Sequence, residues 1–169
     1  MPLTLAEKFW RLENDPAWTT IQLPVEPGQQ VLEEVLVERV GDGWFRIASS
    51  PGMVEGLAAD DVIEPTPDES RGYRLVRRGK NLCIHLFAQA EQRDRVQAML
   101  EQKLGQLEGW LDGTMGATGL CFTVPLKASF REVEAAMQEV VGEEWYYSNV
   151  YDFATDEPLN WWLEGDSCG

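Results

Sequence analysis

The stretch LCIHLF, residues 82–87, decides the fold because it is the first of six segments in a recognisable order. The stretch is mostly apolar and contains one Cys and one His, and this composition indicates a buried strand. Apolar residues then recur at helical spacing across 89–107, which predicts a helix. Strands are expected at 110–117 and 119–126, where glycines separate them, and a last strand is expected at 145–151.

A second helix is predicted between the last two strands. Ser129 and Glu132 form a capping box at its start, and Gly142 is expected to end it. The order strand, helix, strand, strand, helix, strand is that of a ferredoxin-like βαββαβ domain. Right-handed crossovers would place the first and third strands side by side at the centre, with both helices on one face.

The first half of the chain has a different spacing of apolar residues. Thr4 and Glu7 form another capping box, so residues 1–30 are predicted to be a short helix and a linker. Residues 31–80 alternate with period two around glycine and proline turns, which indicates a small curved β-sheet or partial barrel that begins with a hairpin closed at 41–43. The fold class is therefore α+β, with the ferredoxin-like domain and its acidic, aromatic tail at 81–169.

Composition limits the classes of protein that fit. The chain has 169 residues, 44% of them hydrophobic, enough to bury a sizeable core. The apolar runs are too short to span a bilayer, and no leader pattern is recognised, so a cytoplasmic protein without membrane contact is expected. The cysteines Cys83, Cys121 and Cys168 are far apart, which favours reduced thiols.

The net charge of −15 is unevenly distributed. Residues 132–169 contain no Lys or Arg. Their ten acidic residues are Glu132, Glu134, Glu139, Glu143, Glu144, Asp152, Asp156, Glu157, Glu164 and Asp166. Such a surface repels phosphate backbones, so nucleic acid is not expected as a partner and a basic protein is. The alternative is that this charge only maintains solubility.

A longer motif lies at residues 35–63, VLVERVGDGWFRIASSPGMVEGLAADDVI. It contains a hairpin with a charged tip, a Ser-Pro turn, and a Gly-Leu and paired-acid segment that leads into a strand. In these features it resembles an uncharacterised bacterial family, domain of unknown function 4265. The resemblance implies no activity and no catalytic residues.

Motifs of common enzymes are missing from the sequence. There is no GxSxG, HExxH or phosphate-binding GxxxxGK[ST], and the chain has one histidine. Asp60-Asp61 and Glu143-Glu144 are adjacent acids, and adjacent strand residues point to opposite faces, so neither pair is expected to share a proton. The protein is therefore not expected to be an enzyme.

Strand alternation nevertheless places Cys83, His85 and Cys121 together on the sheet face away from the helices. They could form a metal or nucleophile site, but a fourth side-chain ligand is missing, and a packed histidine is the commoner outcome. No metal or cofactor is therefore expected. The alternative function is a small-ligand sensor or enzyme that uses this open face, with His85 as acid or base and Cys83 or Cys121 as nucleophile.

The main functional hypothesis concerns the C-terminal tail. Its aromatic anchors with an acidic rim indicate a protein-binding surface. The candidate binding residues are Trp145, Tyr147, Tyr151, Asp152, Asp156, Glu157, Trp161, Trp162 and Glu164. The expected function is a non-catalytic acidic binding factor, of the inhibitor or immunity type, for a basic partner such as a bacterial toxin. Two alternatives are that the aromatic residues cap the core, and that the chain forms a homo-oligomer through the open sheet face or the last strand's edge.

Overall fold

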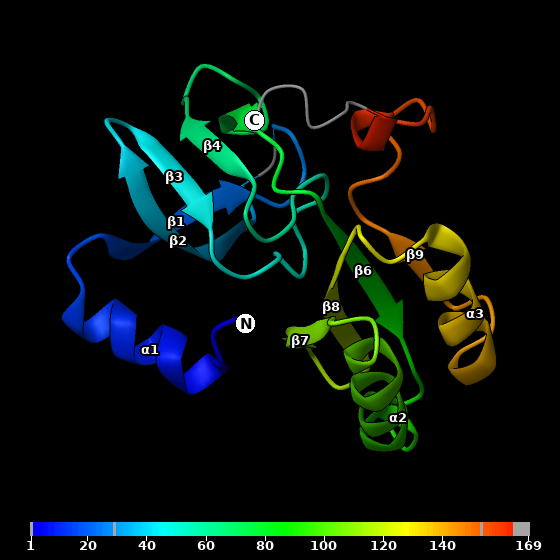
Figure 1. The fold of residues 1–169 in the computed structure, drawn as a ribbon. Helices are drawn as coiled ribbons and strands as arrows, with labels where there is room; N and C mark the ends of the chain where they lie inside the picture. Colours follow the sequence, from blue (N-terminus) through cyan, green and yellow to red (C-terminus); the bar gives the residue numbers. More distant parts are fainter. Residues whose placement is uncertain (1, 29, 153, 164–169) are drawn as a thin grey trace.

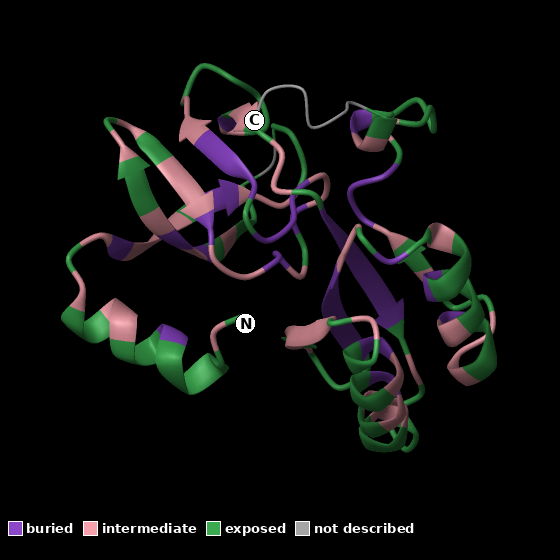
Figure 2. Cartoon of the chain, viewed as in Figure 1, coloured by how far each residue is buried: buried purple, intermediate pink, exposed green. Residues whose placement is uncertain are grey.

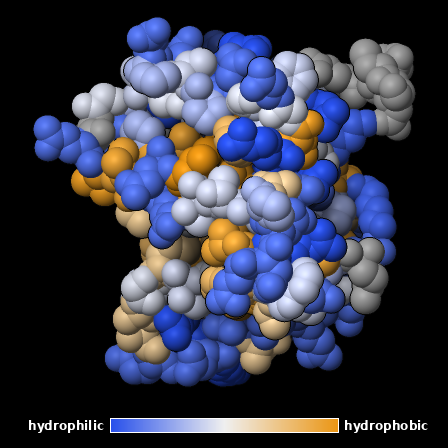
Figure 3. All heavy atoms as spheres, turned by 90° about the vertical axis from the view of Figure 1, so that its left-hand side faces the viewer, coloured by the Kyte–Doolittle hydropathy of each residue, from blue (hydrophilic) through white to orange (hydrophobic). Residues whose placement is uncertain are grey.

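The computed structural model describes residues 2–28, 30–152 and 154–163 (Figure 1). The chain begins with helix α1 (Leu5–Asn14), and its predicted capping box is confirmed: Thr4 Oγ1 accepts from Glu7 N at 3.2 Å, and Glu7 Oε2 accepts from Thr4 N at 2.6 Å. One face of α1 leaves Leu5 and Phe9 more than half exposed. Apolar side chains accordingly interrupt the hydrophilic surface on this side of the molecule (Figure 3).

The first sheet has five antiparallel strands in chain order. They are β1 (Trp18–Pro24), β2 (Leu32–Gly41), β3 (Trp44–Ile47), β4 (Val62–Pro65) and β5 (Tyr73–Arg77). The predicted hairpin is confirmed as β2 and β3, with Gly43 at φ +74° in the turn. The expectation of a linker up to residue 30 is wrong for β1, which pairs with β2 along its whole length. Its buried residues Trp18 and Leu23 have opposite parity, so no period-two pattern reveals the strand.

The second sheet contains the strands predicted from the six-segment order. They are β6 (Asn81–Phe87), β7 (Trp110–Met115), β8 (Gly119–Pro125) and β9 (Trp145–Tyr147), in the order β7-β8-β6-β9 with every neighbouring pair antiparallel. The first and third of these strands, β6 and β8, pair at the centre as predicted. Helices α2 (Arg93–Gly105) and α3 (Phe130–Val140) lie on one side of the sheet (Figure 1).

The larger core lies between these helices and the sheet. Strands β6 and β8 contribute alternate residues such as Ile84 and Phe122, both fully buried, and α2 and α3 contribute Leu104 and Met137. The capping box of α3 is confirmed, and Gly142 adopts φ +72° two residues after the helix. A smaller apolar cluster occupies the first sheet.

The last strand is shorter than the predicted 145–151 because Asn149 replaces backbone pairing with its side chain. Asn149 Oδ1 accepts from Cys83 N at 3.0 Å, and Nδ2 donates to Asn81 O at 2.8 Å. The buried amide therefore continues the edge of β6 after β9 ends. None of the helices in the described part of the chain has the length and apolar character that a membrane crossing requires.

Candidate functional site

The β6–β8 pair carries a second set of buried side chains on the face opposite α2 and α3. Cys83, His85 and Cys121 lie together there, as predicted, and are 0%, 1% and 1% exposed. Figure 2 shows β6 as a buried strand along most of its length. These three residues are called the thiol–imidazole cluster below.

The expectation that this sheet face is open is wrong. The connection from β3 to β4, residues 48–61, crosses it and is called the covering loop (Figure 1). Ala58 of the loop is fully buried against the two sulfur atoms, and Met115 of β7 packs beside them. The face is therefore filled by the chain itself.

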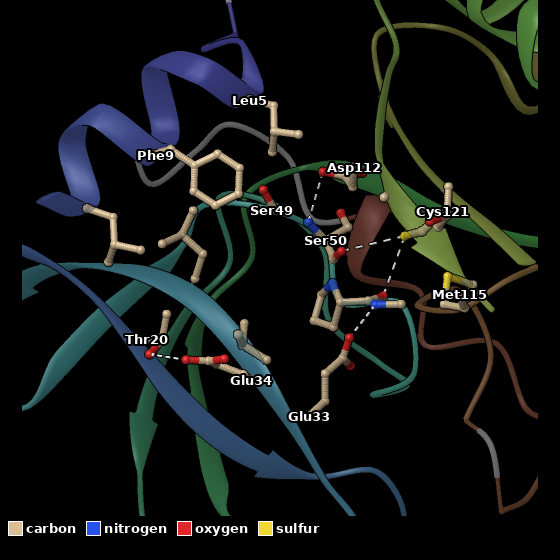
Figure 4. A pocket seen from close by; sticks show the side chains of 17 residues that line it. Leu5, Phe9, Thr20, Glu33, Glu34, Ser49, Ser50, Asp112, Met115 and Cys121 are labelled. Carbon is tan, nitrogen blue, oxygen red and sulfur yellow. Dashed lines mark hydrogen bonds between the residues drawn. The ribbon is translucent and has the colours of Figure 1, made fainter.

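Carboxylates from both sheets hold the covering loop in place (Figure 4). Glu33 of β2 accepts hydrogen bonds from the backbone N–H groups of residues 52–54 at 2.8–3.0 Å. Asp112 of β7 accepts from Ser50 N at 3.1 Å and from Thr123 Oγ1 at 2.5 Å. Burial raises the pKa of Asp112 to about 7, although the Thr123 hydrogen bond opposes that shift.

Asp61 anchors the far end of the covering loop. It accepts from Ala58 N at 2.9 Å and Gly79 N at 2.8 Å, and Arg78 lies 3.2 Å away. Burial raises its pKa to about 6, against the effect of Arg78. Asp60 is exposed, so the two adjacent acids are separated, as predicted, and Asp61 has a structural partner set.

The atoms of the cluster contact one another closely. Cys83 Sγ lies 3.5 Å from His85 Nε2 and 3.8 Å from Cys121 Sγ. Backbone carbonyls of the covering loop point at the same atoms: Pro51 O is 2.8 Å from His85 Nε2 and 3.5 Å from Cys121 Sγ. Since a carbonyl oxygen only accepts, His85 Nε2 carries the proton in this arrangement.

A hydrogen-bonded chain runs from His85 to the edge of the sheet. His85 Nδ1 lies 3.2 Å from Tyr146 Oη, which donates to Glu55 Oε1 at 2.8 Å. Glu55 Oε1 is itself 3.6 Å from His85 Nδ1. Because the Tyr146 hydroxyl donates its proton to Glu55, it can only accept from His85, so Nδ1 of the ring must carry a proton. With Nε2 also protonated, this arrangement favours a doubly protonated imidazole.

The pKa shifts agree with that proton count. Burial by itself lowers the pKa of His85, but hydrogen bonds with Cys83 and Glu55 outweigh it and raise the pKa to about 11. Burial opposes ionisation of Cys83, yet hydrogen bonds from Cys121 and His85 lower its pKa to about 5. The cluster can therefore hold a thiolate–imidazolium pair, or it can ligate a metal ion. As a nucleophile, Cys83 is shielded by the covering loop.

The predicted C-terminal binding residues separate into two groups. Trp161 is buried, and its indole Nε1 donates to Asn149 O at 2.7 Å. Tyr147 and Trp162 are half-buried and make edge contacts with Phe130 of α3. Trp145 is also half-buried, and it donates to Gly142 O at 3.0 Å. These rings cap the helix-side core, which agrees with the alternative that the aromatic residues cap the core and not with exposed anchors.

The remaining predicted binding residues lie outside this aromatic cap. Tyr151 is 50% exposed, and Asp156 and Glu157 are exposed. Asp152 is half-buried and accepts hydrogen bonds from the amides of its own turn. Glu164 lies outside the described residues.

A cavity of about 370 Å³ lies where the first sheet meets the C-terminal segment, and we call it the junction cavity. Its apolar lining includes Val54 and Tyr73, and its polar lining includes Glu55, Arg78 and Ser148. Ser148 Oγ and Glu55 Oε2 are buried and have no hydrogen-bond partner among the described residues. Because Glu55 also bonds Tyr146, this cavity adjoins the chain that ends at His85.

Comparisons with known proteins place the chain as follows. A family model described as Domain of unknown function (DUF4265) matches residues 33–147. A solved structure of a hypothetical protein from Neisseria gonorrhoeae is similar, with 15% sequence identity, a TM-score of 0.50, and coverage of 77% of this chain and 92% of that one. This likeness concerns the fold alone. A search of curated proteins found no match.

Proposed function

Because the chain belongs to the DUF4265 family, whose description states no activity, we propose a function from its geometry: a non-catalytic sensor that binds a small ligand in the junction cavity. The observation that carries this proposal is the pair of buried, unpartnered oxygens at its wall, Ser148 Oγ and Glu55 Oε2, among the described residues. Buried polar atoms are normally paired, and leaving one unpaired costs about 1–3 kcal/mol. A ligand that donates hydrogen bonds to these atoms would supply the partner.

The charges of the lining suggest the class of ligand. The Glu55 carboxylate can accept a hydrogen bond from an amine or amide N–H of a ligand, whereas Arg78 and the exposed Arg71 favour an anionic group. Arg78 donates to Gly56 O and Asp61 through one nitrogen, which leaves other N–H groups of its guanidinium for a ligand. The best candidate is a small zwitterion with an apolar body, such as an amino acid or a dipeptide.

Thermal unfolding with a panel of amino acids and dipeptides tests this function. At least one compound should raise the midpoint, since a ligand that binds only the folded state stabilises it by mass action. Ser148→Ala should abolish that increase. Its ligand-free midpoint is measured alongside, because the Ser148 hydroxyl also lies near enough to Cys83 to help lower the pKa of that thiol. Ser70→Ala, at an exposed serine, is the control. A panel without effect, or full binding by Ser148→Ala, would contradict the proposal.

A second candidate is the acidic factor that binds a basic protein, and a specific observation favours it. Of the acidic residues in 132–157, Glu139 has an ion pair within the described chain, with Lys103 at 2.7 Å. Glu134, Glu143 and Glu144 are exposed with no such pair among the residues that the structure describes. Affinity capture with a salt titration tests this function: a basic partner released by salt supports it, whereas a partner indifferent to salt contradicts it.

The finer fold assignment is also part of the proposal. A ferredoxin-like domain over residues 81–169, after a β-rich module at 31–80, is supported by the strand order β7-β8-β6-β9 and the antiparallel pairings.

A further inference from the structure

We propose that Cys83, His85 and Cys121 form a closed zinc site, with the carbonyl oxygen of Pro51 as the fourth ligand. This inference rests on observations other than those behind the proposed ligand, although Glu55 both lines the junction cavity and faces His85. It concerns three potential ligand atoms that lie within 4.8 Å of one another on a fully covered sheet face. Structural zinc sites are closed in this way, whereas catalytic ones keep an open position.

Two of the three distances between the side-chain ligands fit a tetrahedral ion, and the third, between Cys121 and His85, is no longer than 4.8 Å. Zinc–sulfur bonds of about 2.3 Å and zinc–nitrogen bonds of about 2.0–2.1 Å place two sulfurs about 3.8 Å apart and a sulfur and a nitrogen about 3.5 Å apart. The observed values are 3.8 Å between Cys83 Sγ and Cys121 Sγ and 3.5 Å between Cys83 Sγ and His85 Nε2. Two edges of the tetrahedron therefore already have the required lengths.

The fourth corner comes from the covering loop. Pro51 O lies 3.5 Å from Cys121 Sγ, 3.9 Å from Cys83 Sγ and 2.8 Å from His85 Nε2, so it faces all three side-chain ligands. On metal binding, Nε2 gives up its proton and its hydrogen bond to this oxygen, and both atoms turn their lone pairs to the ion. The 2.8 Å distance between Pro51 O and His85 Nε2 should therefore lengthen to the separation of two ligands of one tetrahedral ion.

An outer shell that would orient the histidine is also present. A metal-binding histidine usually donates its other N–H to a carboxylate or a similar acceptor. His85 Nδ1 faces Tyr146 Oη at 3.2 Å and Glu55 Oε1 at 3.6 Å, which leaves Nε2 directed at the sulfurs. Two thiolates balance the charge of Zn²⁺. Starting from the Cys83 thiolate and the His85 imidazolium, binding releases two protons, one from Cys121 Sγ and one from His85 Nε2.

Ligand chemistry and access support zinc. Thiolates favour soft or borderline ions and discriminate against Mg²⁺ and Ca²⁺. A pocket of about 330 Å³ between α1 and the sheets is lined by Cys121 and Pro51, so it reaches one of the side-chain ligands from that side (Figure 4). Ions can also enter during folding, when the covering loop closes.

Metal analysis of the full chain, purified without chelators and reconstituted with Zn²⁺, tests the site. The expected result is one zinc per chain, and with Co²⁺ a thiolate-to-cobalt charge-transfer band. Cys83→Ser and Cys121→Ser should remove the band and lower zinc affinity at least tenfold, whereas Cys168→Ser, the third thiol of the chain, should retain both.

A second measurement covers variants that fail to fold. In the unaltered protein, Zn²⁺ should raise the midpoint of thermal unfolding and slow alkylation of two thiols, and a chelator should reverse both effects. Absence of stoichiometric metal after reconstitution, equal loss in Cys168→Ser, or a midpoint indifferent to Zn²⁺ would overturn the proposal.

Discussion

The two faces of the β6–β8 pair are equally buried, yet different interactions hold them. On the helix side, residues such as Ile84 and Phe122 are completely covered and wholly apolar. On the loop side, Cys83, His85 and Thr123 are covered to within 1%, but each contacts polar partners. Burial alone therefore does not tell what a residue contributes: one face depends on volume and shape, and the other on paired polar groups.

The largest expected effect is on the helix side. Phe122→Ala should lower the free energy of unfolding by about 3–5 kcal/mol, because it removes a large, fully buried side chain and leaves a cavity. The matched change on the loop side is Thr123→Val, which keeps the volume but removes a hydrogen-bond partner from both Asp112 and Ser50 and should cost about 1–3 kcal/mol. Urea denaturation measures both. A larger loss for Thr123→Val would reverse the comparison.

The covering loop offers a change of intermediate size. Glu33→Gln removes one of two carboxylate oxygens that accept three loop amides, and should cost about 1–3 kcal/mol. A loosened loop should also speed alkylation of the buried thiols by iodoacetamide. Glu34→Gln is the control, because that carboxylate is exposed on β2 and accepts a hydrogen bond from Thr20 Oγ1 of β1. Equal alkylation rates in the two variants would show that Glu33 does not hold the loop.

The helix face could be predicted from the sequence, and the loop face only in part. Alternation along β6 and β8 places Cys83, His85 and Cys121 on one face, because side chains in a strand alternate regardless of what covers them. The cover itself escaped prediction because Ser50 and Pro51 act through backbone carbonyls, which any residue has.

The anchors of the loop come from distant segments. Glu33 and Asp112 are separated by most of both sheets, so no local spacing links either carboxylate to the loop. The tail leaves two alternatives open in the sequence for a related reason. A run of aromatic residues does not tell whether a core lies beneath it, and here Phe130 and Asn149 provide the partners. The Ser50-Pro51-Gly52 turn was the available signal for the covering loop.

The pH dependence of the unfolding free energy provides a smaller test of the loop face. The pKa of Asp112 rises from its ordinary 3.8 to about 7 through burial. Its contribution to stability is therefore complete below about pH 4 and is lost as the pH rises through 7. Asp112→Asn should flatten the decline in unfolding free energy between pH 5 and 8, by at most about 1.4 kcal/mol per pH unit. Asp94→Asn, at a side chain 91% exposed, should leave the decline unchanged.

The smallest test uses neighbouring tyrosines that point to the two faces. Tyr146 Oη bonds His85 and Glu55 on the loop side, so Tyr146→Phe should cost about 0.5–1.5 kcal/mol. Tyr147 packs on Phe130 on the helix side, and its buried Oη has no partner among the described residues, so Tyr147→Phe should cost nothing or stabilise the fold. The two changes remove the same atom one residue apart. If thermal unfolding gave equal losses, a hydroxyl would contribute the same amount with or without partners, and polar pairing would not be what distinguishes the loop face.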